Sequence, residues 1–257
     1  MDTKEIDKHR TWVAKDQNSA ILYRDYQYMK MLLHIKGGVY DKYENQIELD
    51  IPRSYPGSIW LKHPASIALV RLQLKLWCVY STIGYFQGML FLLVPLCHRY
   101  QGLDHISFFA FATLIKRLHF VNKDVINYNA ERREKQEVLH VMRVLSHCEP
   151  SIRKMEQGAL QRMALQIEYG IMFTLGLNRC GANLRNTDLI LDYFLKVLHH
   201  PKEFKHRLKT FSFGFLLCLL KANISTDHLS SLELNRPALH AIIHCATSAG
   251  TLFKAFS

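Results

Sequence analysis

The 257-residue sequence has little glycine and proline, with 12 and 7 residues respectively. This scarcity excludes a collagen-like or low-complexity chain and argues against a turn-rich all-β fold. Hydrophobic residues make up 49% of the chain, as expected for a soluble globular protein. Apolar residues recur at helical spacing almost throughout, and strict alternation is never sustained for long, so we predict an all-α fold.

Long apolar runs are also missing. The first thirty residues are interspersed with charges, unlike a signal peptide. The longest apolar segments, residues 89–97 and 211–220, reach about half of the ~20 residues that a membrane-spanning helix requires. We therefore expect a cytoplasmic protein, neither secreted nor membrane-spanning.

Cysteine and histidine form no metal-binding pattern. The six cysteines lie far apart in mainly apolar segments and include no C-x-x-C pair, which favours reduced thiols in the core. His240 and His244 have the i, i+4 spacing of two ligands on one helix face. Ala241, however, stands where a zinc-protease H-E-x-x-H motif has glutamate. We therefore predict no metal site.

Acidic residues are outnumbered, because 33 Lys and Arg against 22 Asp and Glu give a net charge of +11. The excess favours an acidic partner, whether a protein face, an anionic membrane or nucleic acid. Two basic clusters are interrupted by acidic or apolar residues and lack interleaved aromatics, so we expect no nucleic acid. We interpret them as solvated helix faces and leave open a weak contact with anionic membrane. The clusters are Arg132, Arg133, Lys135 and Lys202, Lys205, Arg207, Lys209.

No repeat, linker or long block of one charge divides the chain, so we predict a polar lead-in over residues 1–20 and one multi-helical domain over 21–257. The clearest helix follows Pro64, which suits a first helical turn, and ends at residues 81–84. Further helices are expected at 86–100, with a kink at Pro95, and at 105–120. The helix after Pro64 has two apolar stripes: Leu69, Leu72, Leu76, Val79 and Val70, Leu74, Trp77.

The second half of the chain continues the helical pattern. Apolar residues at helical spacing predict helices around 138–145, 160–171 and 204–219. A polar loop over 181–187 precedes another helix that carries Ile190, Phe194 and Val197. Thr187 or Asp188 is the expected N-cap of that helix.

Two short segments do not fit a pattern of helix packing. Residues 47–53 read IELDIPR, and residues 84–89 read GYFQGM. They match I-x-x-D-x-x-R and G-Y-x-Q-G-M, so the chain resembles the TBC domain family of GTPase-activating proteins for Rab-type small GTPases. The resemblance covers residues 20–257 and is strongest over 47–96. Each motif alone is short, but their order and the helix between them make the pair specific.

The resemblance implies that Arg53 and Gln87 are an arginine finger and a glutamine finger, both acting in trans on GTP held by a Rab-type GTPase. A guanidinium offers permanently charged donors to the transferring phosphoryl group. A carboxamide offers an acceptor and a donor at once, and so can hold the attacking water near the γ-phosphate. GTP and Mg²⁺ are expected to arrive with the GTPase, since the chain has no G-x-x-x-x-G-K-[ST] motif and no cofactor of its own.

Other motif residues are expected to support the fingers. Asp50 would orient the Arg53 guanidinium by a charge-assisted hydrogen bond, since it lies one helical turn earlier. Tyr85 would position the loop that carries Gln87, and Gly84 and Gly88 would allow its backbone to approach a partner closely. Ile47 begins the first motif.

Plainer interpretations stay open. Arg53 read alone is a solvated cation, Gln87 a residue that caps a helix start, Asp50 an N-cap near Pro52, and Tyr85 a core aromatic. The alternative function is a catalytically silent TBC-like module that binds a small GTPase or adaptor.

The N-terminal part of the chain departs from the family pattern. Arg10 and Trp12 do not have the family's R-x-x-x-W spacing, which predicts an atypical N-terminal subdomain.

Overall fold

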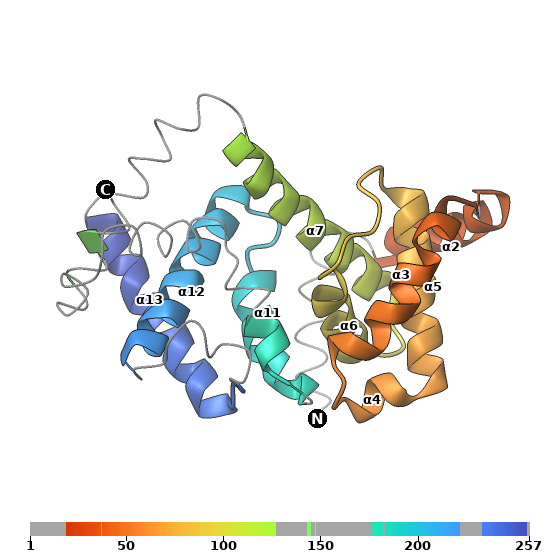
Figure 1. Cartoon of the computed structure of the whole chain (residues 1–257). Coiled ribbons are helices and arrows are strands. Elements are labelled where there is room, and N and C mark those ends of the chain that lie inside the picture. The colour runs from red at the N-terminus through yellow and green to blue at the C-terminus, as the bar shows by residue number, and fades with distance from the viewer. Residues whose placement is uncertain are drawn as a thin grey trace. The chain divides into compact units, whose positions relative to one another are not determined.

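The computed structural model describes residues 19–36, 38–126, 143–144, 147, 176–181, 183–221 and 233–255. Within these ranges every regular element is a helix, which confirms the all-α prediction (Figure 1). The chain divides into two compact units, Met1–Leu114 and Ile115–Ser257. The predicted helix at 160–171, most of the one at 138–145, and Arg10 and Trp12 lie outside the described residues.

The first unit is organised around α5 (Pro64–Tyr80), which contacts α2 (Ser19–Lys36), α3 (Gly38–Ser54), α4 (Ile59–Lys62) and α6 (Leu90–Arg99). α5 begins as predicted, with Pro64 in its first turn and the His63 side chain accepting a hydrogen bond from the Ala65 amide. The predicted stripe of Val70, Leu74 and Trp77 is fully buried. α5 is therefore the central helix of this unit.

Polar side-chain contacts hold α3 and α2 against α5. The Arg71 guanidinium on α5 makes a bidentate ion pair with the Glu48 carboxylate on α3, at 2.5 and 2.7 Å. This pair lowers the pKa of Glu48 below its ordinary value. Gln73, which is fully buried, donates from Nε2 to the Tyr26 hydroxyl of α2 at 3.1 Å. The charged contact is bidentate and so specifies the orientation of α3 on α5.

Two helix boundaries in this unit differ from the prediction. α6 begins at Leu90 and not near residue 86, because Gly84 and Gly88 have positive φ angles of 74° and 102° that interrupt a helix. Pro95 lies inside α6 as expected. α7 runs over Asp104–Ile126, so it ends six residues later than predicted and continues past the boundary between the units.

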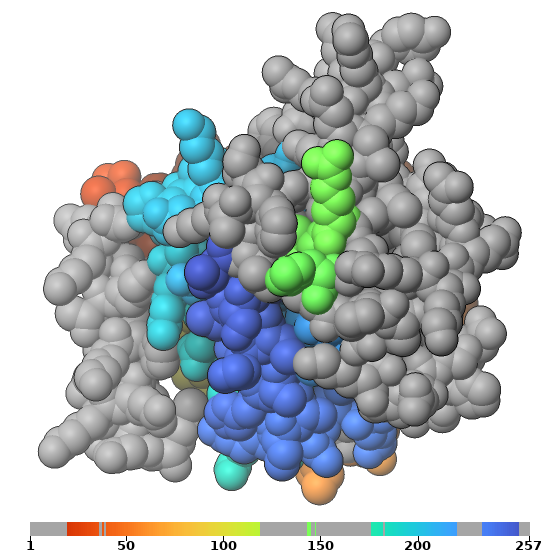
Figure 2. Space-filling view, turned by 90° about the vertical axis from the view of Figure 1, so that its left-hand side faces the viewer, coloured from red at the N-terminus to blue at the C-terminus, as the bar shows by residue number. Residues whose placement is uncertain are grey.

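The second unit contains α11 (Leu184–Leu195), α12 (Pro201–Lys221) and α13 (Arg236–Ala255). The predicted stripe of Phe204, Leu208, Phe211, Phe215 and Leu219 is buried along α12. α12 and α13 pack side by side, and both reach the face seen in Figure 2. A Cβ atom at Gly214 would lie 2.6 Å from the Ile242 carbonyl oxygen and 2.7 Å from the Ala246 nitrogen. The absence of a side chain at Gly214 therefore allows the two backbones to approach.

The predicted N-cap of α11 is wrong. Asn183 caps the helix, and its side-chain oxygen accepts a hydrogen bond from the Arg185 amide at 3.2 Å. Thr187 is buried inside the helix and donates its hydroxyl to the Leu184 carbonyl. Asparagine is as good an N-cap as threonine, so composition alone did not decide between them.

The described cysteines are free thiols. Cys78, Cys97 and Cys180 are buried, as predicted for core residues. The sulfurs of Cys218 and Cys245 lie 3.7 Å apart, well beyond the ~2.05 Å of a disulfide bond. None of the helices in the described ranges combines the length and apolar character needed to cross a membrane.

Candidate functional site

The first motif forms the last two turns of α3. Ile47, Asp50, Ile51 and Ser54 are buried, and their spacing of three and four residues places them on one helix face. The Ser54 hydroxyl donates to the Asp50 carbonyl at 2.7 Å. These four residues therefore pack the end of α3 into the core.

Arg53 lies in this last turn but is exposed. The backbone around it is anchored, because Ser54 and Tyr55 are buried and the Tyr55 hydroxyl donates to the Phe91 carbonyl of α6 at 2.9 Å. No hydrogen bond or ion pair from the Arg53 guanidinium to any described residue is present. The guanidinium is thus held on a fixed backbone and keeps its donors for an external acceptor.

The second motif forms the loop between α5 and α6. Gly84 is buried there, and its carbonyl accepts a hydrogen bond from the indole Nε1 of Trp77 at 2.8 Å. A Cβ atom at Gly84 would overlap the Tyr43 hydroxyl of α3, and φ is +74°. Both the conformation and the close approach of Tyr43 therefore require glycine at this position.

Gln87 lies at the tip of a tight turn. The Met89 amide donates to the Phe86 carbonyl at 3.3 Å, so Gln87 and Gly88 are the two central residues of the turn. Gly88 has a φ of +102°, a conformation that favours glycine. Met89 is fully buried, whereas Gln87 is exposed. The turn thus presents the carboxamide outward from an anchored base.

A buried hydrogen bond joins the two motifs. The Tyr85 hydroxyl donates to Oδ2 of Asp50 at 2.9 Å, and Asp50 is only 8% exposed. Burial and then the Asp50 carboxylate raise the pKa of Tyr85 above that of an ordinary tyrosine, so the hydroxyl keeps its proton. Asp50 precedes Arg53 by three residues, and Tyr85 precedes Gln87 by two. This bond therefore links the segment that carries Arg53 to the segment that carries Gln87.

The expected role of Asp50 differs from its observed contacts. Its carboxylate accepts from Tyr85, and the described side chains include no ion pair between Asp50 and Arg53.

Two residues in contact with the loop, Tyr43 and Trp77, were not predicted from the sequence. The pattern assigned Trp77 to a core stripe and gave no signal for Tyr43, since both contacts with Gly84 arise from tertiary packing.

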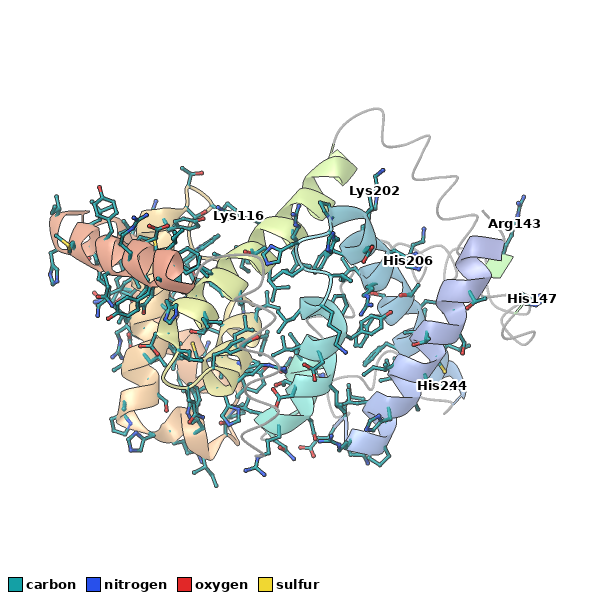
Figure 3. All side chains as sticks on the ribbon, turned by 180° about the vertical axis from the view of Figure 1, so that it is seen from behind. Lys116, Arg143, His147, Lys202, His206 and His244 are labelled. Carbon is teal, nitrogen blue, oxygen red and sulfur yellow. The ribbon has the colours of Figure 1, made fainter. Side chains whose placement is uncertain are left out.

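The other candidate groups do not assemble into a site. His240 and His244 are exposed on α13, where Figure 3 labels His244, and no group of three metal-binding side chains occurs within the described ranges. Lys202, also labelled in Figure 3, and Lys205 are exposed on α12 as predicted. Arg207 instead is half-buried, donates to the Tyr193 carbonyl and stacks on the Tyr193 ring. The cluster at 132–135 lies outside the described residues.

The family model of the Rab-GTPase-TBC domain matches residues 7–155, a range that contains both motifs. No curated relative and no solved structure matches the chain.

Proposed function

Because the chain belongs to the Rab-GTPase-TBC domain family, we propose that it accelerates GTP hydrolysis by a Rab-type GTPase and that Arg53 and Gln87 act on the nucleotide. TBC domains bind Rab GTPases. The observation that carries the proposal is the buried Tyr85–Asp50 hydrogen bond, which ties together two segments that each expose one of these side chains.

Arg53 supplies the charge that hydrolysis requires. Negative charge spreads over the oxygens of the transferring phosphoryl group in the transition state, and a small GTPase alone stabilises it poorly. A guanidinium presents a planar fork of donors that remains charged at all physiological pH values. Arginine fingers of this kind raise rates by about 10³ to 10⁵. An exposed Arg53 on an anchored helix end meets the requirement for such a donor.

Gln87 orients the nucleophile. Its amide oxygen accepts a hydrogen bond from the attacking water while its NH₂ group donates to a γ-phosphate oxygen. Holding water and phosphate in line lowers the entropic cost of attack. The exposed tip of an anchored turn suits this role, because the side chain reaches outward while the backbone stays in place.

GTP and Mg²⁺ belong to the partner in this proposal, and the GTP-bound form of the GTPase is the substrate. The chain itself contributes donors and acceptors only. In this proposal its contact with the GTPase completes the constellation, and neither protein alone holds all the groups that the transition state needs.

Single-turnover GTP hydrolysis by a panel of Rab proteins tests the proposal. We expect the wild-type chain to stimulate at least one member, and Arg53→Ala and Gln87→Ala each to remove most of the stimulation. Arg24→Ala and Gln27→Ala on α2 are matched controls that should retain it.

The panel also separates the two candidate functions. Binding to a GTP-loaded Rab protein without any stimulation would identify a silent interaction module. Stimulation that is unchanged in both Arg53→Ala and Gln87→Ala would eliminate the two-residue mechanism.

A further inference from the structure

We propose that Trp77 and Tyr43 are positioning residues that hold Gln87 in place by fixing the backbone of Gly84. The inference rests on the proposed function and extends it to two residues outside both motifs. It starts from the observation that helices α5 and α3 each contribute one aromatic side chain that contacts the same buried glycine.

Trp77 fixes the loop through a directed hydrogen bond. Its side chain is fully buried, and Nε1 donates to the Gly84 carbonyl at 2.8 Å. The ring of Phe111 meets the indole edge to face at 5.5 Å, and Tyr80 lies at 6.2 Å. Because these rings restrict the indole, the direction of its N–H group is fixed independently of the loop. The Gly84 carbonyl must then lie where the N–H group points.

Tyr43 restricts the same residue from α3. Its hydroxyl and ring occupy the space in which a Cβ atom of residue 84 would lie, so the backbone of Gly84 packs directly against them. The Tyr43 ring also meets the Tyr85 ring at 6.4 Å with an interplanar angle of 62°. Tyr43 thus limits the movement of residues 84 and 85 toward α3.

Together with the Tyr85–Asp50 hydrogen bond, these contacts restrain two consecutive residues of the loop. Gln87 follows two positions later at the tip of the turn. A displacement of about 1 Å in a reacting group costs up to roughly 10²-fold in rate. Loosening Gly84 is therefore expected to slow the chemical step and to leave binding of the GTPase unchanged, because the exposed surface keeps its side chains.

Trp77→Phe tests this inference, since it removes the N–H donor and keeps an aromatic ring. With the most responsive Rab protein of the panel, we expect kcat of stimulated hydrolysis to fall about tenfold with KM unchanged. In a Gln87→Ala background the same substitution should have no further effect, whereas in an Arg53→Ala background its full effect should persist. Trp60→Phe on α4 is the matched control and should behave as wild type.

Tyr43 provides a second, milder test. Tyr43→Ala should lower kcat in the same way, and Tyr43→Phe should lower it less, because it keeps the ring that contacts Gly84 and Tyr85. Amide hydrogen exchange reports the loop directly, and we expect faster exchange over residues 81–89 in Trp77→Phe and Tyr43→Ala but not in Trp60→Phe.

Two results would overturn the inference. One is a wild-type kcat for Trp77→Phe and Tyr43→Ala while Gln87→Ala is impaired. The other is an equal loss in the presence and absence of Gln87, which would indicate a general structural role. A wild-type chain that stimulates no Rab protein is a different outcome, because it refutes the proposed function. In that case hydrogen exchange still tests the inference: unchanged exchange over residues 81–89 in Trp77→Phe and Tyr43→Ala would show that these side chains do not restrain the loop.

Discussion

At the residue scale, the contact that organises the site is the hydroxyl–carboxylate pair of Tyr85 and Asp50. Asp50 is buried, and burying a polar side chain costs free energy unless it is hydrogen-bonded. Tyr85 provides a donor at 2.9 Å. The same hydrogen bond therefore gives the buried carboxyl group a donor and joins the two motifs.

Tyr85→Phe removes that donor and leaves the Asp50 carboxylate buried without it. We expect the free energy of unfolding to fall by about 1–3 kcal/mol, the usual cost of an unsatisfied buried group. Urea denaturation measures the change, and GTPase stimulation should also decrease. Tyr28→Phe is the control, because Tyr28 is 60% exposed on α2, and it should cost almost nothing. Equal stabilities for Tyr85→Phe and wild type would show that the bond contributes little.

The sequence was sufficient to predict Arg53 and Gln87 as candidates, because their motifs are local strings of residues. It was not sufficient to predict which group Asp50 contacts. The spacing of three residues favoured Arg53, but the Tyr85 hydroxyl, 35 positions away, is the partner. Trp77 and Tyr43 were missed for the same reason, since their contacts with Gly84 depend on how α3 and the loop after α5 pack.

At the scale of elements, helix interiors and the start of α5 at Pro64 followed the pattern of the sequence, whereas the starts of α6 and α11 did not. The buried stripes of α5 and α12 were predictable because burial repeats with the helical period. The start of α6 was not, because the turn at residues 86–89 depends on a positive φ at Gly88. The N-cap of α11 likewise depended on which of several suitable polar residues adopts the cap conformation.

The packing of α12 on α13 gives a prediction with an internal control. Gly214→Ala places a Cβ atom 2.6 and 2.7 Å from backbone atoms of α13, so the helices must separate. We expect a loss of about 1–3 kcal/mol in stability, as for an overpacked core. Gly250→Ala on α13 meets only side-chain atoms, at 3.5 and 3.8 Å, and should be neutral or up to ~1 kcal/mol stabilising. Thermal or urea unfolding of both variants measures these changes in stability. A destabilised Gly250→Ala with an unaffected Gly214→Ala would contradict the close approach of the α12 and α13 backbones at Gly214.

At the scale of the whole molecule, the thiol and phenol groups that are buried in the core bind their protons more tightly in the folded chain than in the unfolded chain. Burial raises the pKa of Cys78 from 9.0 to about 11 and that of Cys97 to about 12. Burial, reinforced by nearby carboxylates, raises the pKa of Tyr40 from 10.0 to about 12. The pKa of Tyr26 and that of Tyr85 are raised as well. The folded chain therefore keeps protons that the unfolded chain releases in alkaline solution.

The resulting pH dependence has a definite sign. Below about pH 9 both states hold these protons and stability is unaffected, whereas above it the unfolded chain loses protons and the free energy of unfolding falls. Urea denaturation between neutral pH and about pH 11 should show a progressive loss, with a shallower slope in Cys78→Ala. A stability that stays constant to about pH 11 would contradict the burial of these groups.

The central claim is that Arg53 and Gln87 together contact the reacting phosphoryl group of a bound GTPase. The most direct measurement is the affinity of the chain for a Rab protein loaded with GDP and aluminium fluoride, which mimics the transferring phosphoryl group, relative to the same protein with GDP alone. We predict a gain of about a hundredfold or more for the wild-type chain, typical of a transition-state analogue, and its loss in Arg53→Ala and in Gln87→Ala. An undiminished gain in either variant would contradict the claim.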